Sequence, residues 1–271
     1  MMNILLFGGG LQVLTIARSL KNKGYTVDVI GEHNEISRKS RYVGKCYDIV
    51  LKELQVESFV AILKEGNYSV VIPMEDDYAT WLSIHKKEVQ QLSGAKCAVM
   101  DYDVYALASD KTRLLDFCRV HGLPHPKTAI IQNNYDELVK EVGFPALIKP
   151  SHSAGSRGIH IVNSVEELKE WSEKTIAEYG ECALQEYICS KDYYYNVMLY
   201  RTADGNWGNH TITKIVRYYP IKGGSSSLCI SIENKKLLSI CKEILDKLGW
   251  VGFADFDVLE KGDGDYRVIE I

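Results

Sequence analysis

The chain has 271 residues, 46% of them hydrophobic and 25% charged, with a formal net charge of −4. At about 150 residues per domain this length predicts two domains, and the average composition excludes a disordered, collagen-like or coiled-coil protein. The small net charge indicates neither a nucleic-acid-binding nor a membrane-binding surface. The sequence also has no apolar run near the ~18 residues that a membrane helix needs, no signal-peptide pattern, and no C-x-x-C pair among its 7 cysteines. We therefore expect a soluble cytoplasmic protein with reduced thiols, without a nucleic-acid or membrane partner.

Short β-branched runs alternate with helical patterns along the first hundred residues. The expected strands cover residues 3–7, 25–30, 47–51, 70–72 and 97–100. The expected helices cover residues 11–22, 57–64 and 77–92. Strand–helix alternation with short connections predicts a parallel, doubly wound sheet, so residues 1–104 are expected to form a Rossmann-like α/β domain.

The pattern changes after residue 104. The expected helices cover residues 110–121, 135–142, 165–179 and 234–248. The expected strands cover residues 128–131, 146–149, 159–162, 183–187, 251–259 and 266–271, and residues 193–219 are also strand-like. Hairpin-like connections between strands predict antiparallel pairing, so residues 105–271 are expected to form a second domain of α+β type.

The triplet Gly8-Gly9-Gly10 lies between the first expected strand and helix. A dinucleotide fingerprint would need a glycine where Val13 stands, although Glu32 is spaced like a ribose-binding acid. The pattern favours a tight turn that binds no NAD. An NAD-dependent oxidoreductase stays open as an alternative.

A second glycine-rich loop, residues 151–158, follows Lys149 at the end of an expected strand. It is not a Walker A loop, because no Lys-Ser/Thr pair follows the glycines and the next element is strand-like. Its unobstructed backbone N–H groups and the lysine could close over a triphosphate, with an ordinary surface hairpin as the alternative. A third stretch, residues 223–227 after Arg217, is expected to be a mobile loop.

Two carboxylates are expected to face each other across the last two strands. Alternation places Asp255 and Asp257 on one face, and Glu270 shares a face with Val268 and Tyr266. A two-residue turn at 262–263 would set Asp255 opposite Glu270, and a turn at 263–264 would set Asp257 there. Opposed like charges destabilise a sheet unless a cation lies between them, and oxygen ligands suit magnesium.

These features, in this order, resemble the ATP-grasp superfamily, in the branch of the carbamoyl-phosphate synthase large subunit and carboxylate–amine ligases. The resemblance covers about residues 105–271 and follows an expected Rossmann-like domain, as is usual in that superfamily. It implies ATP binding by two lysines, a glycine loop, a hinge that reads adenine through backbone groups, and an acid at the ribose. In this sequence those residues are Lys111, Lys149, Gly155, Ser156, Arg157, Gly158, Glu186, Tyr187, Ile188 and Asp192.

The resemblance also implies magnesium and a reaction. Asp255 matches the first metal carboxylate and Glu270 the second, while Arg217 would steady an acyl phosphate. The implied activity is an ATP- and Mg2+-dependent ligase acting on small-molecule carboxylate and amine substrates, with a homodimer as one assembly left open. A non-catalytic nucleotide-binding protein is the alternative. Because the family motif continues with asparagine, proline and arginine and Ile271 is the last residue, we expect an ATP-grasp domain incomplete at its C-terminus.

Overall fold

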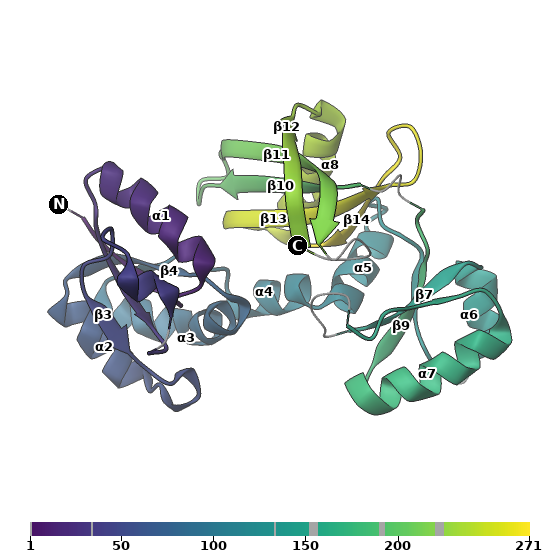
Figure 1. The fold of residues 1–271 in the computed structure, drawn as a ribbon, viewed down its shortest axis with the longest axis horizontal. Helices are drawn as coiled ribbons and strands as arrows, with labels where there is room; N and C mark the ends of the chain where they lie inside the picture. The colour runs from purple at the N-terminus through teal and green to yellow at the C-terminus, as the bar shows by residue number, and fades with distance from the viewer. Residues whose placement is uncertain (1, 34, 133, 152–156, 190–192, 220–224) are drawn as a thin grey trace. The chain divides into compact units, whose positions relative to one another are not determined.

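The computed structural model describes residues 2–33, 35–132, 134–151, 157–189, 193–219 and 225–271. The chain divides into two compact units, Met1–Tyr105 and Ala106–Ile271 (Figure 1). The first holds one parallel sheet and the second holds two antiparallel sheets, so the predicted α/β fold class is confirmed. In the described ranges, no helix combines the length and the apolar character that crossing a membrane requires.

The first unit is a five-stranded sheet in the order β3-β2-β1-β4-β5, with every neighbouring pair parallel. Its strands are β1 (Asn3–Phe7), β2 (Thr26–Gly31), β3 (Cys46–Asp48), β4 (Tyr68–Pro73) and β5 (Lys96–Cys97). Its helices are α1 (Leu11–Asn22), α2 (Val56–Glu65) and α3 (Asp76–Ser93), with 3-10 turns η1 (Ile36–Lys39) and η2 (Leu51–Glu53); α4 (Tyr102–Ser109) crosses the boundary between the units. Leu5 and Phe7 pack into one core cluster and Ile4 and Leu6 into another, because successive side chains of a strand point to opposite faces. Both faces are therefore covered, as a parallel sheet requires.

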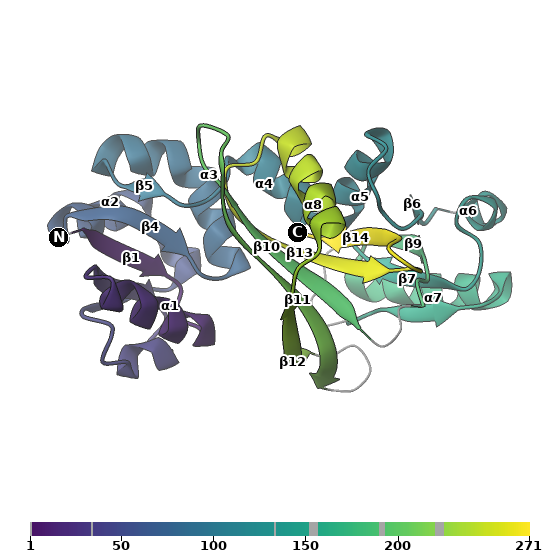
Figure 2. The ribbon, with the colours of Figure 1, turned by 90° about the horizontal axis from the view of Figure 1, so that it is seen from above.

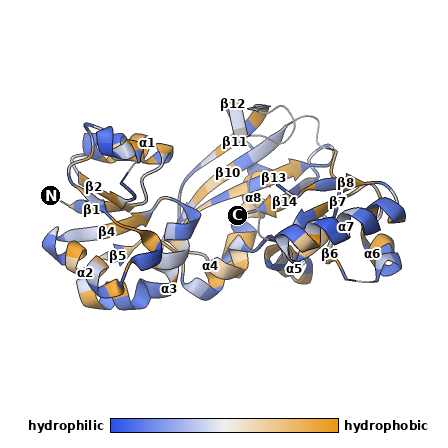
Figure 3. Cartoon of the chain, turned by 60° about the horizontal axis from the view of Figure 1, so that its bottom comes forward, coloured by the Kyte–Doolittle hydropathy of each residue, from blue (hydrophilic) through white to orange (hydrophobic). Residues whose placement is uncertain are grey.

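The second unit begins with α5 (Lys111–Val120) and a four-stranded sheet in the order β6-β9-β7-β8. Its strands are β6 (Thr128–Ile130), β7 (Ala146–Pro150), β8 (His160–Val162) and β9 (Cys182–Glu186), all paired antiparallel. Helices α6 (Tyr135–Val142) and α7 (Val165–Tyr179) supply buried Leu138 and Leu168 to a common core with Ile148. Figure 3 shows α7 as largely hydrophilic, which fits a helix with only one buried side.

The other sheet of this unit has five strands in the order β12-β11-β10-β13-β14. They are β10 (Tyr194–Arg201), β11 (Trp207–Tyr219), β12 (Ser225–Ile232), β13 (Gly252–Glu260) and β14 (Tyr266–Glu270). Helix α8 (Lys235–Leu248) lies against one face of this sheet (Figure 2). On β13, Ala254, Phe256 and Val258 are buried while the alternate residues are not, so the odd-numbered side chains form the other face.

One local prediction was wrong, and one helix was not predicted. Residues 225–227 were expected in a mobile loop, yet they begin β12. They belong to this strand because β12 pairs antiparallel with residues 212–219 of β11, with Ser225 opposite Tyr219 and Ser226 opposite Tyr218. Residues 223 and 224 of that stretch lie outside the described residues. Helix α4 was not expected at all, since its short apolar pattern gave no clear helical period.

Candidate active site

Lys149 is a buried cation near the end of β7. Its residue surface is only 9% exposed, and burial lowers the pKa of its ammonium group to about 8, which the Glu270 and Asp257 carboxylates partly oppose and Lys111 reinforces. A buried charge is costly unless groups of opposite charge lie near it. Lys149 therefore stands within electrostatic reach of one further lysine and two carboxylates.

Lys111 reaches the same place from α5. The helix begins at this residue because Asp110 caps it, accepting hydrogen bonds from the backbone N–H groups of Thr112 and Arg113 at 3.0 and 3.1 Å. The Lys111 Nζ lies 3.3 Å from Glu270 Oε1. Thr112 Oγ1 also lies 2.9 Å from the hydroxyl of Ser151, the residue that follows β7. The start of α5 and the end of β7 are thus held together, with both lysines beside Glu270.

The β13–β14 hairpin sets Asp257 opposite Glu270. The loop is not a two-residue turn: the Lys261 N–H donates to Asp265 O at 2.9 Å, so three residues lie between this pair. The register then shifts between Asp257 and Val258, which adds one residue to β14 and moves Glu270 out of the alternation that buries Tyr266 and Val268. The expectation that Glu270 shares their face was wrong for this reason.

The Asp257 carboxylate lies close to two other carboxylates. Its pKa is raised to about 7, first by burial and then by the Glu270 and Asp255 carboxylates, while the two lysines act in the opposite sense. Asn196 on β10 lies directly opposite Asp257 and its side-chain amide donates a hydrogen bond to Asp257 Oδ1. Sequence reasoning missed Asn196, because its role depends on the pairing of β10 with a strand some sixty residues later.

The donor set fits magnesium. Across the described parts of the chain, no cluster of three or more His, Cys, Asp or Glu side chains is arranged to hold a metal ion. Magnesium does not need one, since it commonly binds through one or two carboxylates together with substrate phosphates and water. A cation between Asp257 and Glu270 would relieve the repulsion that raises the pKa of Asp257.

Comparison with known proteins decides the family. Residues 121–271, more than half of the chain, match the family model described as D-ala D-ala ligase C-terminus. The chain belongs to this family of the ATP-grasp superfamily. The superfamily predicted from the motifs is thereby confirmed.

Two curated relatives and one solved structure illustrate the ATP-grasp likeness. The D-aspartate ligase of Enterococcus faecium (strain Aus0004) is 26% identical over 247 residues, which are 80% of this chain and 56% of that protein. The carbamoyl phosphate synthase large chain of Methanocorpusculum labreanum is 24% identical over 165 residues, 59% of this chain and 15% of that one. The biotin carboxylase domain of Hydrogenobacter thermophilus 2-oxoglutarate carboxylase has a TM-score of 0.75 at 21% identity, covering 99% of this chain and 63% of that one. The chain therefore spans less than two thirds of the length of each.

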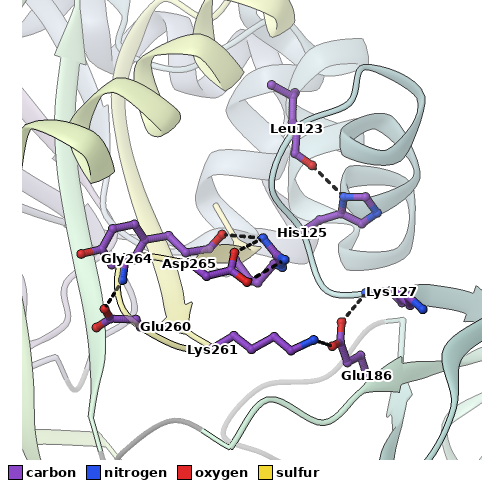
Figure 4. Close-up of polar contacts among 10 residues, drawn as sticks. Leu123, His125, Lys127, Glu186, Glu260, Lys261, Gly264 and Asp265 are labelled. Carbon is purple, nitrogen blue, oxygen red and sulfur yellow. Dashed lines mark hydrogen bonds and ion pairs between the residues drawn. The ribbon is translucent and has the colours of Figure 1, made fainter.

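The expected ATP-grasp hinge follows β9. The Glu186 carboxylate forms an ion pair with Lys261 and accepts a hydrogen bond from the Lys127 N–H at 3.2 Å (Figure 4). Burial would raise the pKa of Glu186, but these hydrogen bonds outweigh it and hold the pKa below its usual value. The Tyr187 N–H donates to Pro145 O at 3.2 Å, and Ile188 is buried. The Glu186 side chain thus holds the β13–β14 loop beside β9. Because this side chain is already engaged, contacts to an adenine base would come from the backbone groups of the residues that follow Glu186.

The remaining predicted residues are only partly described. Gly155, Ser156 and Asp192 lie outside the described residues. Gly158 has φ +70°, and a Cβ there would lie 2.8 Å from the Tyr179 ring, so glycine is required by both conformation and packing. Arg157 is exposed, as is Arg217, which lies on β11 between two register shifts. Among the described residues, no hydrogen bond or ion pair joins Arg217 to Lys149 or Glu270.

The Gly8–Gly10 turn of the first unit is filled by the chain's own carboxylates. A Cβ on Gly9 would lie 1.5 Å from Glu35 Oε2, and the Gly10 N–H donates to Glu75 Oε1 at 3.1 Å. Burial raises the pKa of Glu35, and Glu75 adds to that rise. A pyrophosphate would have to displace both acids from this turn. The turn therefore favours the expected role of a structural strand-to-helix connection.

We expect that NAD+ and NADP+ do not change the melting temperature of the protein. Glu35 and Glu75 occupy the turn where the dinucleotide phosphates would lie, and they carry the same sign of charge. Differential scanning fluorimetry at millimolar dinucleotide measures this, with MgATP as the positive control. A saturable increase with NAD+ would contradict the structural role of the turn.

Proposed function

We propose that this protein is an ATP- and Mg2+-dependent ligase that joins a small-molecule carboxylate to an amine through an acyl phosphate. The observation that carries the proposal is the gathering of two lysines and two carboxylates: the Lys111 Nζ lies 3.3 Å from Glu270, and buried Lys149 is influenced by Glu270, Lys111 and Asp257. Membership of the ATP-grasp superfamily supports it. The structure of the related biotin carboxylase domain was solved with MgADP and bicarbonate, which supports ATP and magnesium as the cofactors of this chain.

Each charged group has a part in this proposal. Lys111 and Lys149 would bind the phosphates of ATP, and Asp257 with Glu270 would hold Mg2+. The motif match pointed to Asp255 as the first metal carboxylate, but Asp257 is the one paired with Glu270, which favours Asp257. Magnesium, when bound, would neutralise charge on the phosphates. Asn196 would fix the orientation of the Asp257 carboxylate through its hydrogen bond.

The other nucleotide contacts follow the resemblance. We assign the loop residues Gly155, Ser156, Arg157 and Gly158 to covering the phosphates. Glu186 would orient the hinge through Lys127 and Lys261, so that Tyr187 and Ile188 present backbone groups to adenine. Asp192 would bind the ribose and Arg217 the acyl phosphate.

The reaction has two displacements. A carboxylate oxygen attacks the γ-phosphorus of ATP, the bond to the β-phosphate oxygen breaks, and ADP leaves. The ammonium form of the amine first loses one proton to water. The neutral nitrogen then attacks the acyl carbon, the bond to the phosphate oxygen breaks, and the nitrogen gives up one further proton to the departing phosphate. Two like unit charges about 4 Å apart repel by roughly 4 kcal/mol at an effective dielectric of 20, so the first step needs the two lysines most.

The proposal extends to the domain organisation, the assembly and the location of the protein. Residues 1–104 would be the Rossmann-like domain that precedes an ATP-grasp domain at 105–271. A homodimer is supported by the dimeric form of the related biotin carboxylase domain. All seven cysteines are free thiols, which supports a reducing, cytoplasmic location.

We expect ADP and phosphate release that requires both a carboxylate and an amine. A coupled assay over a panel of amino acids and other carboxylates, each with and without a second amine, measures it. Release that depends on both substrates identifies a ligase. A melting-temperature increase with MgATP but no release with any pair would favour the non-catalytic nucleotide-binding alternative.

A further inference from the structure

Three rows of side chains lie on the face of β10 and β13 that carries the metal carboxylate. The register pairs Asn196 with Asp257, Met198 with Asp255, and Tyr200 with Phe253. Alternation puts all six on one face, because Val197, Leu199, Ala254 and Phe256 between them are buried. Successive rows are two residues apart, which is about 6.6 Å along a strand. Asp255 is therefore one row from the proposed metal site.

Unlike Asp257, Asp255 has no polar partner for its side chain among the described residues. Asp257 accepts a hydrogen bond from Asn196 and faces Glu270, whereas no hydrogen bond or ion pair joins the Asp255 side chain to any other described residue. The residue is exposed to solvent and lies one row from Asp257 on the same face of the sheet. A carboxylate in such a place gains stability from any positive charge that arrives.

The next row is an exposed aromatic pair. Tyr200 is 47% exposed and Phe253 is 61% exposed, although both are large and lie on paired strands. Aromatic faces attract organic cations as well as apolar carbon atoms. A carboxylate beside two open rings is a combination that suits an ammonium group carried on a carbon skeleton.

We propose that Asp255 receives the amine substrate as its ammonium ion, beside the Tyr200 and Phe253 rings. The assignment rests on the proposed function. Of the two substrates, the carboxylate and its acyl phosphate are negative and belong with Lys111 and Lys149, whereas the amine is positive at neutral pH. A negative side chain one row from Asp257 attracts the amine and repels a second carboxylate. Asp255 is in this role a specificity residue and takes no proton, since the ammonium ion loses one proton to water before the nitrogen attacks and a second proton to the departing phosphate.

The test compares Asp255→Asn with Glu173→Gln, which removes the same charge from an exposed position of α7. We expect Asp255→Asn to raise the KM of the amine about tenfold or more, because a hydrogen bond to a charged group is lost. The kcat, the KM of ATP and the melting-temperature increase with MgATP should stay within about twofold of wild type. Asp255→Glu should recover part of the lost amine affinity, and Glu173→Gln should change nothing.

The outcomes separate the two proposals. An unchanged amine KM in Asp255→Asn overturns this inference alone, since wild-type turnover then still supports the ligase. Loss of the MgATP effect in Asp255→Asn also overturns it, because Asp255 would belong to the metal site. A wild-type protein that releases no ADP with any carboxylate and amine overturns both.

Discussion

Replacing Lys149 with methionine is expected to abolish the increase in melting temperature that MgATP produces. Lys149 is buried and under the electrostatic influence of Lys111 and Glu270, and the proposed function makes its ammonium group a ligand of the ATP phosphates. Charge-assisted contacts of this kind are roughly twice as strong as neutral ones. Differential scanning fluorimetry with and without MgATP measures the effect. Lys140→Met, at an exposed position of α6, should leave the increase intact.

The unfolding free energies of the wild type and of Lys149→Met, measured without nucleotide as a function of pH, test whether the variant folds like the wild type. Because the pKa of Lys149 is lowered to about 8 from 10.5, the folded state disfavours its charged form. Below pH 8 the lysine is charged in both states and its burial is costly, and above pH 10.5 it is neutral in both and the cost disappears. The wild type should therefore gain about 3 kcal/mol of unfolding free energy relative to Lys149→Met between these limits. If the wild type and Lys149→Met show this pH-dependent difference and the variant still responds fully to MgATP, Lys149 is not a phosphate ligand.

The sequence predicted that Asp255 and Asp257 share one face of β13, but it left open which of them lies opposite Glu270. Alternation along β13 correctly placed Asp255 and Asp257 together, because a two-residue period needs only local information. Which of them meets Glu270 depends on loop length and on the register shift in β14, and neither follows from residue type. A two-residue turn at 263–264 gave the observed pairing through a different geometry. The agreement on Asp257 therefore reflects a compensation between a longer loop and an extra residue.

The residue pattern alone did not predict the long-range contacts of the candidate site, for a related reason. Lys111, Lys149 and Glu270 come from α5, β7 and β14, and only the family resemblance suggested that they meet. The turn at Gly9 shows the opposite case, where a motif suggested a ligand and Glu35, twenty-six residues later, fills the space. Glycine patterns indicate that another group lies close to the backbone. They do not report whether it is a ligand or the chain itself.

Replacing Glu270 with glutamine is expected to weaken the binding of magnesium that supports nucleotide binding. The change deletes one of two opposed carboxylates while keeping the shape of the side chain, and it also frees Lys111 from its ion pair at 3.3 Å. ATP should still bind through the lysines, but the Mg2+ concentration for half-maximal stabilisation should rise about tenfold or more, since a contact between charged groups is lost. Titration of Mg2+ at fixed ATP, followed by melting temperature, measures it.

Two variants of β13 then decide which aspartate acts with Glu270. Asp257→Asn should behave like Glu270→Gln, because Asp257 lies directly opposite Glu270 and the pair needs both charges to hold a cation. Asp255→Asn changes the same group two residues away on the same face and should leave the Mg2+ titration unaltered. The reverse result, with the magnesium effect lost in Asp255→Asn and kept in Asp257→Asn, would return the metal to the residue that the motif first suggested. It would also withdraw Asp255 from the amine, since one carboxylate cannot serve a metal ion and an ammonium ion at once.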